Sequence, residues 1–167
     1  KNKELNKLIE QLNSDTALCV LTENTSNLWN DKFICCIDRT LERTQGKPEF
    51  LPEIVITIGN SIISKKIKTL LRKYNPMEHW HVEDTNRAQD IFSSLTQFIP
   101  IQPESFFTQF LSEDLIFNSS SFGDLWENEF ITSEKKHSSF LKNCLWSDLK
   151  AHREIQEIIS NYNVNIQ

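Results

Sequence analysis

Short continuous apolar runs recur along the first two thirds of the chain. The clearest are Ala17–Leu21 (ALCVL) and Ile54–Ile58 (IVITI). Glu78–Val82 (EHWHV) is a third predicted strand, and Leu95–Ile101 contains a fourth that is broken by Pro100. A continuous apolar run such as Ala17–Leu21 is typical of a strand buried on both faces of a parallel sheet. The pattern therefore predicts four strands.

Segments with helical spacing separate these runs. Leu5, Leu8, Ile9 and Leu12 share one face of a helix predicted over residues 3–13, and the same spacing predicts helices over 31–42, 64–74 and 103–111. Strands that alternate with helices favour a parallel sheet with crossover helices on both faces. The predicted fold is therefore a doubly wound, Rossmann-like α/β domain.

The pattern changes after about residue 112. Asn118–Ser121 (NSSS) is a linker signal, and two further helices are predicted over 123–143 and 147–159, the second with Ser147 as its N-cap. Because no strand follows, we divide the chain into an α/β domain, residues 1–117, and a helical tail, residues 118–167.

Composition removes several classes of function. The 167 residues carry a net charge of −5, which does not suit a nucleic-acid-binding protein. No apolar run approaches the roughly 20 residues that span a bilayer. Only three glycines are present, so neither a dinucleotide-binding nor a phosphate-binding glycine loop can be built. None of the four cysteines lies in a CxxC pair, so we expect no structural zinc site and free thiols in the cytoplasm.

One turn combines several groups that bind anions. Gly59, Ser61, Ser64, Lys65 and Lys66 lie between the carboxyl end of the predicted strand 54–58 and the amino end of the next helix. Ligands favour this place in open α/β sheets, and a helix amino terminus carries free N–H groups and partial positive charge. We interpret the turn as a candidate carboxylate or phosphate site. The alternative is a solvated lysine face.

Three other pairs have a functional and a structural interpretation. His79 and His81 face the same way on a strand, either as half of a metal site or as a polar strand face. The adjacent Cys35 and Cys36 are either redox-active or packing residues. Glu23 and Asp38 are either an acid–base pair or surface carboxylates. We favour the structural interpretation for each.

The tail carries aromatic residues with the same ambiguity. Trp126, Phe130, Phe140 and Trp146 either bind a partner or pack on the protein itself.

Three long segments resemble one family of enzymes. PEIVITIGNSIISKKIKTLLRKYNPMEHWHV, from Pro52, and VLTENTSNLWNDKFICCIDRTL, from Val20, are similar to the central domain of the MenD family, particularly to members from the Bacteroidetes lineage. The final LWSDLKAHREIQEIISNYNVNIQ resembles the first helix of that family's third domain. These are the thiamine-diphosphate-dependent 2-succinyl-5-enolpyruvyl-6-hydroxy-3-cyclohexene-1-carboxylate synthases of menaquinone biosynthesis.

The resemblance implies a transferase that adds decarboxylated 2-oxoglutarate to isochorismate. Thiamine diphosphate and Mg²⁺ or Mn²⁺ are expected to be held by the first and third domains of partner subunits in a homo-oligomer, and not by this chain. The chain, which begins at Lys1 without an initiator methionine, is expected to be an internal part of a longer protein and inert alone.

The family also contributes a basic pair to the substrate pocket from its central domain. The resemblance assigns this pair to Lys65 and Lys66, beside Ser64, although the second position is usually arginine. It assigns no catalytic, cofactor-binding or metal-binding residue to this chain. The family's central domain usually opens with a strand ahead of the helix that begins here near Lys3, and that strand is missing from this sequence.

Two other hypotheses belong to different classes. The chain could be a free-standing nucleotide- or anion-binding α/β module, which would bind nucleotide by itself. It could also be an interaction domain without a ligand, which would form a stable complex through its tail helices.

Overall fold

The computed structural model describes residues 2–44, 46–59, 62–88, 90–113 and 120–162. The chain forms two compact units, Lys1–Phe130 and Ile131–Gln167. The first unit contains the sheet and the candidate site. The division that the sequence suggests, at residues 117 and 118, falls within residues 114–119, which lie outside the described part, and it stays a prediction.

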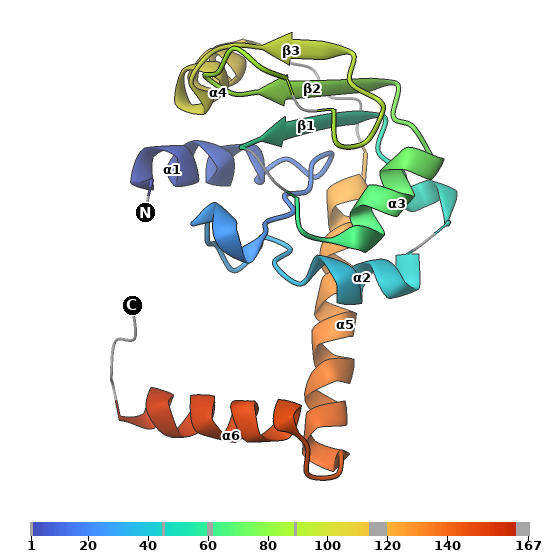
Figure 1. Ribbon diagram of the computed structural model, residues 1–167, viewed down its shortest axis with the longest axis vertical. Helices are drawn as coiled ribbons and strands as arrows, with labels where there is room; N and C mark the ends of the chain where they lie inside the picture. The colour runs from blue at the N-terminus through green and yellow to red at the C-terminus, as the bar shows by residue number, and fades with distance from the viewer. Residues whose placement is uncertain (1, 45, 60–61, 89, 114–119, 163–167) are drawn as a thin grey trace. The chain divides into compact units, whose positions relative to one another are not determined.

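A parallel sheet of three strands, in the order β1-β2-β3, forms the centre of the first unit (Figure 1). The strands are β1 (Ile54–Ile58), β2 (Glu78–Val82) and β3 (Gln97–Ile99). Ile54 is opposite Glu78, and Trp80 is opposite Gln97. The predicted bounds of the first two strands are confirmed, and the third is shorter than its predicted range.

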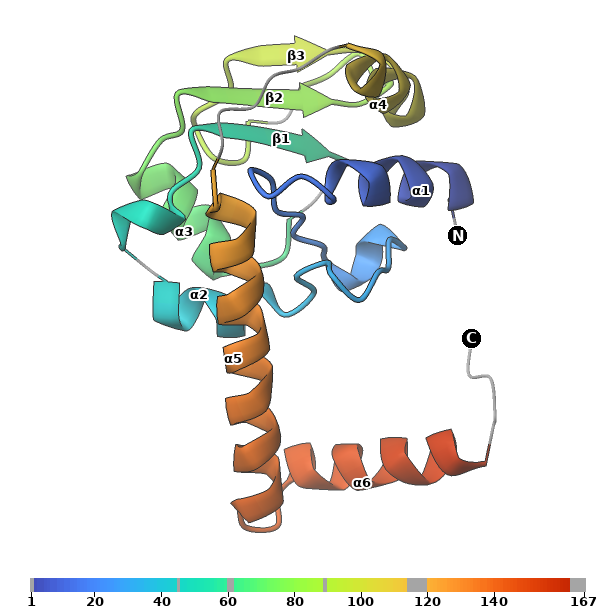
Figure 2. The same cartoon turned by 180° about the vertical axis from the view of Figure 1, so that it is seen from behind.

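One face of the sheet packs against α1 (Lys3–Leu12) and α4 (Pro103–Ser112) (Figure 2). The alternation of side chains along each strand places Ile56, Trp80 and Val82 on this face. They contact a buried cluster whose members come from both helices and one loop: Leu5, Ile9, Phe33, Phe106 and Phe107.

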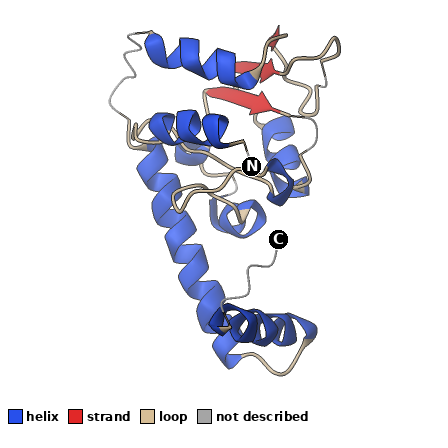
Figure 3. Cartoon of the chain, turned by 90° about the vertical axis from the view of Figure 1, so that its left-hand side faces the viewer, coloured by secondary structure: helices blue, strands red, loops and turns tan. Residues whose placement is uncertain are grey.

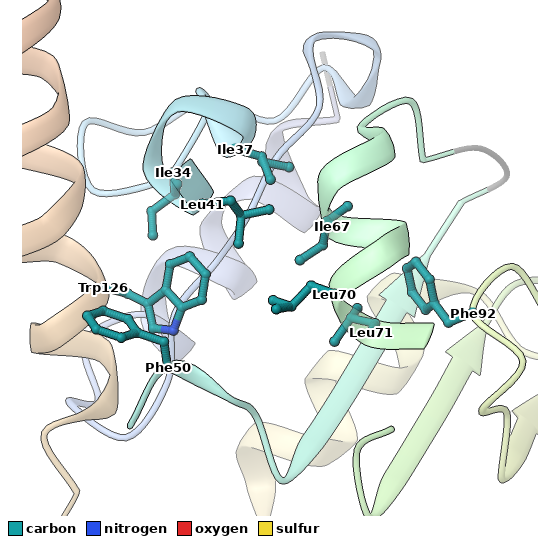
Figure 4. Packing of buried hydrophobic residues seen from close by; sticks show 9 residues of the cluster. All are labelled: Ile34, Ile37, Leu41, Phe50, Ile67, Leu70, Leu71, Phe92 and Trp126. Carbon is teal, nitrogen blue, oxygen red and sulfur yellow. The ribbon is translucent and has the colours of Figure 1, made fainter. Parts of the chain in front are cut away.

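The opposite face packs against α3 (Lys65–Lys73), and α2 (Ile37–Thr44) packs on α3. This second cluster contains Ile34, Ile37, Leu41, Phe50, Ile67, Leu70, Leu71, Phe92 and Trp126 (Figure 4). Two short 3₁₀ helices, η1 (Asn24–Ser26) and η2 (Pro48–Phe50), lie in the loops. Helices therefore cover both faces of a parallel sheet, which confirms the predicted Rossmann-like α/β class (Figure 3).

The predicted strand over residues 17–21 is wrong in its extent. Within the described ranges, this segment forms one parallel bridge, between Leu21 and Ile34, and does not join the three-stranded sheet. Its apolar side chains are nevertheless packed, since Cys19 and Leu21 contact one cluster and Val20 contacts the other. The continuous apolar run thus predicted correctly that the segment packs against the core, but not that it lies outside the sheet.

The helix predicted over residues 31–42 begins later, at Ile37. The Lys32 N–H donates to Asn30 Oδ1, and the Ile34 N–H donates to the Val20 carbonyl, so this stretch is held in a turn and a bridge. Phe33 and Ile34 are buried as predicted, but from an extended segment that directs one into each cluster.

The first turns of α5 (Phe122–Asn143) belong to the first unit as far as Phe130. The Gly123 N–H donates to the Thr16 carbonyl at 2.7 Å, and a Cβ on Gly123 would lie 2.1 Å from the Leu18 carbonyl oxygen. Only glycine permits this approach, which brings Trp126 into the core, where its ring packs edge-on against Phe50.

The second unit contains the rest of α5 and α6 (Asp148–Asn161). The Ser147 Oγ accepts a hydrogen bond from the Lys150 N–H, which confirms the predicted N-cap. Phe140 is 57% exposed and Trp146 is 75% exposed, whereas Trp126 and Phe130 pack in or against the core of the first unit. The four aromatic residues are thus not one stripe. Among the described residues, none of the helices is long and apolar enough to cross a membrane.

Candidate functional site at the start of helix α3

The turn after β1 places the predicted site residues in front of α3. Gly59 ends the strand with a φ of +75°, a conformation that favours glycine. Ser61 lies outside the described residues. Ser64 is the N-cap of α3, and its Oγ accepts a hydrogen bond from the Ile67 N–H at 3.1 Å. This cap is the reason that the helix begins at Lys65.

Glu23 supplies a negative charge to the amino end of α3. Its Oε1 accepts hydrogen bonds from the N–H groups of Ile63, at 3.0 Å, and Ser64, at 2.8 Å. A carboxylate at this position satisfies free backbone donors and interacts favourably with the helix dipole. The first turn of α3 contains no acidic residue of its own, so the compensating charge comes from a segment 40 residues away in sequence.

Asp38 provides a second carboxylate at the same residue. Its Oδ1 accepts a hydrogen bond from the Ser64 Oγ–H. Ser64 therefore uses its N–H for Glu23, its hydroxyl proton for Asp38, and an oxygen lone pair for Ile67. The sequence left Glu23 and Asp38 as either an acid–base pair or surface carboxylates, and the structure shows that both bind Ser64.

The two predicted lysines have different surroundings. The Lys66 Nζ forms an ion pair with Glu42, and it lies 3.5 Å from the Asp38 carbonyl oxygen. Lys65 is exposed, and its ammonium group makes no hydrogen bond or ion pair with any residue of the described ranges. The ammonium of Lys65 is therefore open to an external anion, whereas that of Lys66 already has a carboxylate partner.

These contacts change the expected chemistry of the turn. The N–H groups of Ile63 and Ser64 hold Glu23, so they are not available to a ligand while that contact persists. Of the anion-binding groups predicted at this turn, the Lys65 ammonium remains available to a ligand. Protein carboxylates already neutralise the amino end of α3 beside it. The lysines and serines of the sequence did not indicate that Glu23 would bind the N–H groups before α3 or that Glu42 would pair with Lys66. The one signal was the missing acidic residue in the first turn of α3.

His79 and His81 lie buried on the α3 face of the sheet, each with 1% of its surface exposed. The Thr57 Oγ1 lies 3.0 Å from His79 Nε2 and 2.9 Å from His81 Nδ1. At the outer ends, Ser94 Oγ lies 3.2 Å from His79 Nδ1, and Glu83 Oε2 lies 3.4 Å from His81 Nε2. The four contacts form one continuous chain of polar groups.

The histidine chain is explained by hydrogen bonding within the sheet. Burial lowers the pKa of His79, Asp90 opposes this shift, and His81 adds to it. Among the described residues, no group of three or more His, Cys, Asp or Glu side chains could hold a metal ion. The polar strand face is therefore the interpretation that the geometry supports.

The cysteines differ in access to solvent. Burial raises the pKa of the Cys19 thiol to about 12. Cys35 is exposed, and its Sγ lies 3.9 Å from that of Cys36, without a disulfide. The four cysteines all lie in the described part of the chain and none forms a disulfide there, so Cys35 and Cys36 are thiols in this structure.

Fold and site together define a parallel α/β domain with a basic turn at the carboxyl end of its edge strand. No family model matches the chain. Three curated relatives carry the name 2-succinyl-5-enolpyruvyl-6-hydroxy-3-cyclohexene-1-carboxylate synthase. The chain is 34% identical to that of Flavobacterium johnsoniae over 152 residues, 36% to that of Flavobacterium psychrophilum over 146, and 32% to that of Porphyromonas gingivalis over 143.

These matches cover 90%, 86% and 81% of the chain but only 27%, 26% and 25% of the relatives. The chain is thus homologous to a segment of the 2-succinyl-5-enolpyruvyl-6-hydroxy-3-cyclohexene-1-carboxylate synthase family, and it spans about a quarter of these relatives' length. The resemblance seen in the sequence is confirmed.

Proposed function

We propose that this chain is the central part of a 2-succinyl-5-enolpyruvyl-6-hydroxy-3-cyclohexene-1-carboxylate synthase, a thiamine-diphosphate-dependent transferase of menaquinone biosynthesis. The observation that carries the proposal is collinear similarity over 90% of the chain, at 34% identity, to a relative with that name. The role of the chain in the whole enzyme is that of a scaffold and a wall of the substrate pocket. The enzyme acts in the cytoplasm as a homo-oligomer.

The cofactor belongs to other parts of the enzyme. The described residues offer no cluster of three or more potential metal ligands, so they do not fit Mg²⁺ or Mn²⁺ with its diphosphate. The first and third domains of the enzyme would hold thiamine diphosphate and the metal ion. We expect no binding of thiamine diphosphate to the 167-residue chain by calorimetry. A parallel titration of the chain with a nucleotide tests the alternative, and binding there would favour the free-standing anion-binding module.

Lys65 is the residue that contacts substrate. Both proposed substrates, 2-oxoglutarate and isochorismate, are carboxylates, and the exposed Lys65 ammonium is open to an external anion. Lys66 is the second basic residue of the proposed pair, and its ammonium group reaches substrate only when its ion pair with Glu42 opens. Ser64 contributes by capping α3, because its hydroxyl group already serves Asp38 and Ile67.

The test is steady-state kinetics of Lys65→Ala in the full-length enzyme. A hydrogen bond to a charged group contributes roughly 1.5–3 kcal/mol, which corresponds to a rise in KM for a carboxylate substrate of about 10- to 100-fold. Lys68→Ala, one turn away on the same helix, is the matched control and should leave KM unchanged. Equal KM values for Lys65→Ala and the unmodified enzyme would refute the role of Lys65.

A further inference from the structure

Lys65 takes its position from the residue that precedes it. Ser64 is the N-cap at which the chain enters α3, so a displacement of Ser64 carries Lys65 with it. Within the described residues, two carboxylates from distant segments hold Ser64. Glu23 binds its N–H together with that of Ile63, and Asp38 binds its hydroxyl group.

The segment that carries Glu23 is itself fixed. The parallel bridge between Leu21 and Ile34 is closed by hydrogen bonds from the Thr22 N–H to the Ile34 carbonyl, at 3.0 Å, and from the Ile34 N–H to the Val20 carbonyl, at 2.8 Å. Glu23 follows directly, and the side chain of Thr22 is buried. The carboxylate therefore extends from an anchored backbone, so it can hold the start of α3 in one place.

Asp38 and Glu42 make a second connection, from α2. Asp38 binds the Ser64 hydroxyl group, and Glu42 pairs with Lys66 one helical turn further on. Glu23 differs from both because it alone accepts from the backbone N–H groups of Ile63 and Ser64 among the contacts described. Glu23 therefore fixes the position of the backbone that leads into Lys65.

We propose that Glu23 is a positioning residue for Lys65, whose carboxylate holds the Ile63 and Ser64 N–H groups and thereby fixes where α3 presents the Lys65 ammonium to a substrate carboxylate. The inference rests on the proposed function, in which Lys65 contacts substrate. It assigns Glu23 no direct contact with substrate and no proton transfer.

Two physical effects of Glu23 predict opposite changes in KM. As a negative charge near the site, Glu23 repels a carboxylate substrate, so its removal would lower KM. By holding the backbone N–H groups of Ile63 and Ser64, Glu23 also fixes the position of Lys65, so its removal would raise KM. A displacement of a binding group by about 1 Å can lower enzyme activity by up to 10²-fold, so we expect the positioning effect to be larger than the charge effect.

The experiment compares Glu23→Ala and Glu23→Gln in the full-length enzyme, with and without Lys65→Ala. We expect Glu23→Ala to raise KM for the carboxylate substrate about 10-fold with little change in kcat. Glu23→Gln keeps an oxygen acceptor for the two N–H groups and loses only the repelling charge, so its KM should equal that of the unmodified enzyme or lie slightly below it. In the Lys65→Ala background, Glu23→Ala should add nothing, because the group that it positions is gone.

Hydrogen exchange gives a readout that does not depend on activity. Glu23→Ala should accelerate exchange of the Ile63 and Ser64 amides, and Glu23→Gln should largely preserve their protection. Unchanged exchange, a lower KM for both variants, or a full additional KM increase in the Lys65→Ala background would each overturn the positioning role. If Lys65→Ala alone leaves KM unchanged, the proposed substrate contact fails and this inference fails with it. A KM increase for Lys65→Ala but not for Glu23→Ala refutes the positioning role only.

Discussion

Replacement of Thr57 by valine tests whether the buried histidine chain stabilises the sheet by hydrogen bonding. Thr57 lies on β1 between the two rings of β2, with its Oγ1 3.0 Å from His79 Nε2 and 2.9 Å from His81 Nδ1. The Oγ1 also lies 3.4 Å from the Trp80 carbonyl oxygen. A hydroxyl group carries one proton, so it accepts at least one of the two ring hydrogen bonds from an imidazole N–H. Thr57→Val keeps the shape of the side chain and removes both contacts.

The expected loss follows from burial. Both rings are 1% exposed, so the two nitrogens cannot turn to bulk water. A buried polar group left without a partner costs about 1–3 kcal/mol, which gives roughly 2–6 kcal/mol for two. The added methyl group of valine offsets about 1 kcal/mol of this. Thr57→Val should therefore lower the free energy of unfolding by about 1–5 kcal/mol, compared with the roughly 5–15 kcal/mol typical of a domain.

The assay is urea unfolding of the 167-residue chain, followed by tryptophan fluorescence. Thr57→Ser is the matched control, because it keeps the hydroxyl group and loses only a methyl group, at a cost of about 1 kcal/mol. The argument would be refuted if Thr57→Val unfolded within about 0.5 kcal/mol of the unmodified chain. It would also be refuted if Thr57→Ser were the more damaging change.

Two further predictions concern titration. Burial lowers the pKa of His79 below its ordinary 6.5, so between 6.5 and the folded-state pKa the unfolded chain binds a proton that the folded chain does not. The free energy of unfolding should therefore fall as pH drops through this window, by at most about 1.4 kcal/mol per pH unit from this residue. In a His79→Gln variant, the free energy of unfolding should depend less steeply on pH. An equal pH dependence in the variant and the unmodified chain would contradict the lowered pKa of His79. Cys19 is partly buried and its pKa is raised to about 12, whereas Cys35 is exposed. Iodoacetamide at pH 8 should therefore alkylate Cys35 much faster than Cys19 in the folded chain, and urea should remove most of the difference. Equal labelling of the two thiols in the folded chain, measured by mass spectrometry, would contradict this prediction.

The parts of the fold that the sequence predicted correctly are those with local causes. Ile54–Ile58 consists of β-branched residues with strong strand preferences, and Glu78–Val82 contains Trp80 and Val82; each forms a strand with the predicted bounds. Ala17–Leu21 has the same local signal, but a strand also needs a partner along its length. That partner depends on the rest of the fold, and here it is the single residue Ile34.

The same distinction applies to the candidate site. Ser64 and the two lysines after it were found because a cap and a helix start are local features. Glu23 and Asp38 were considered as a possible acid–base pair, and nothing in their spacing indicated that both would meet at Ser64, 41 and 26 residues away. Contacts at such separations are decided by the packing of whole elements, which one sequence does not reveal.

The central claim is tested most directly by an activity assay of the full-length protein expressed from the complete gene. With thiamine diphosphate and Mg²⁺ present, we expect the full-length protein to consume isochorismate and 2-oxoglutarate together, with release of carbon dioxide. The 167-residue chain at the same concentration should consume neither. A folded full-length protein without turnover of the two substrates would contradict the account.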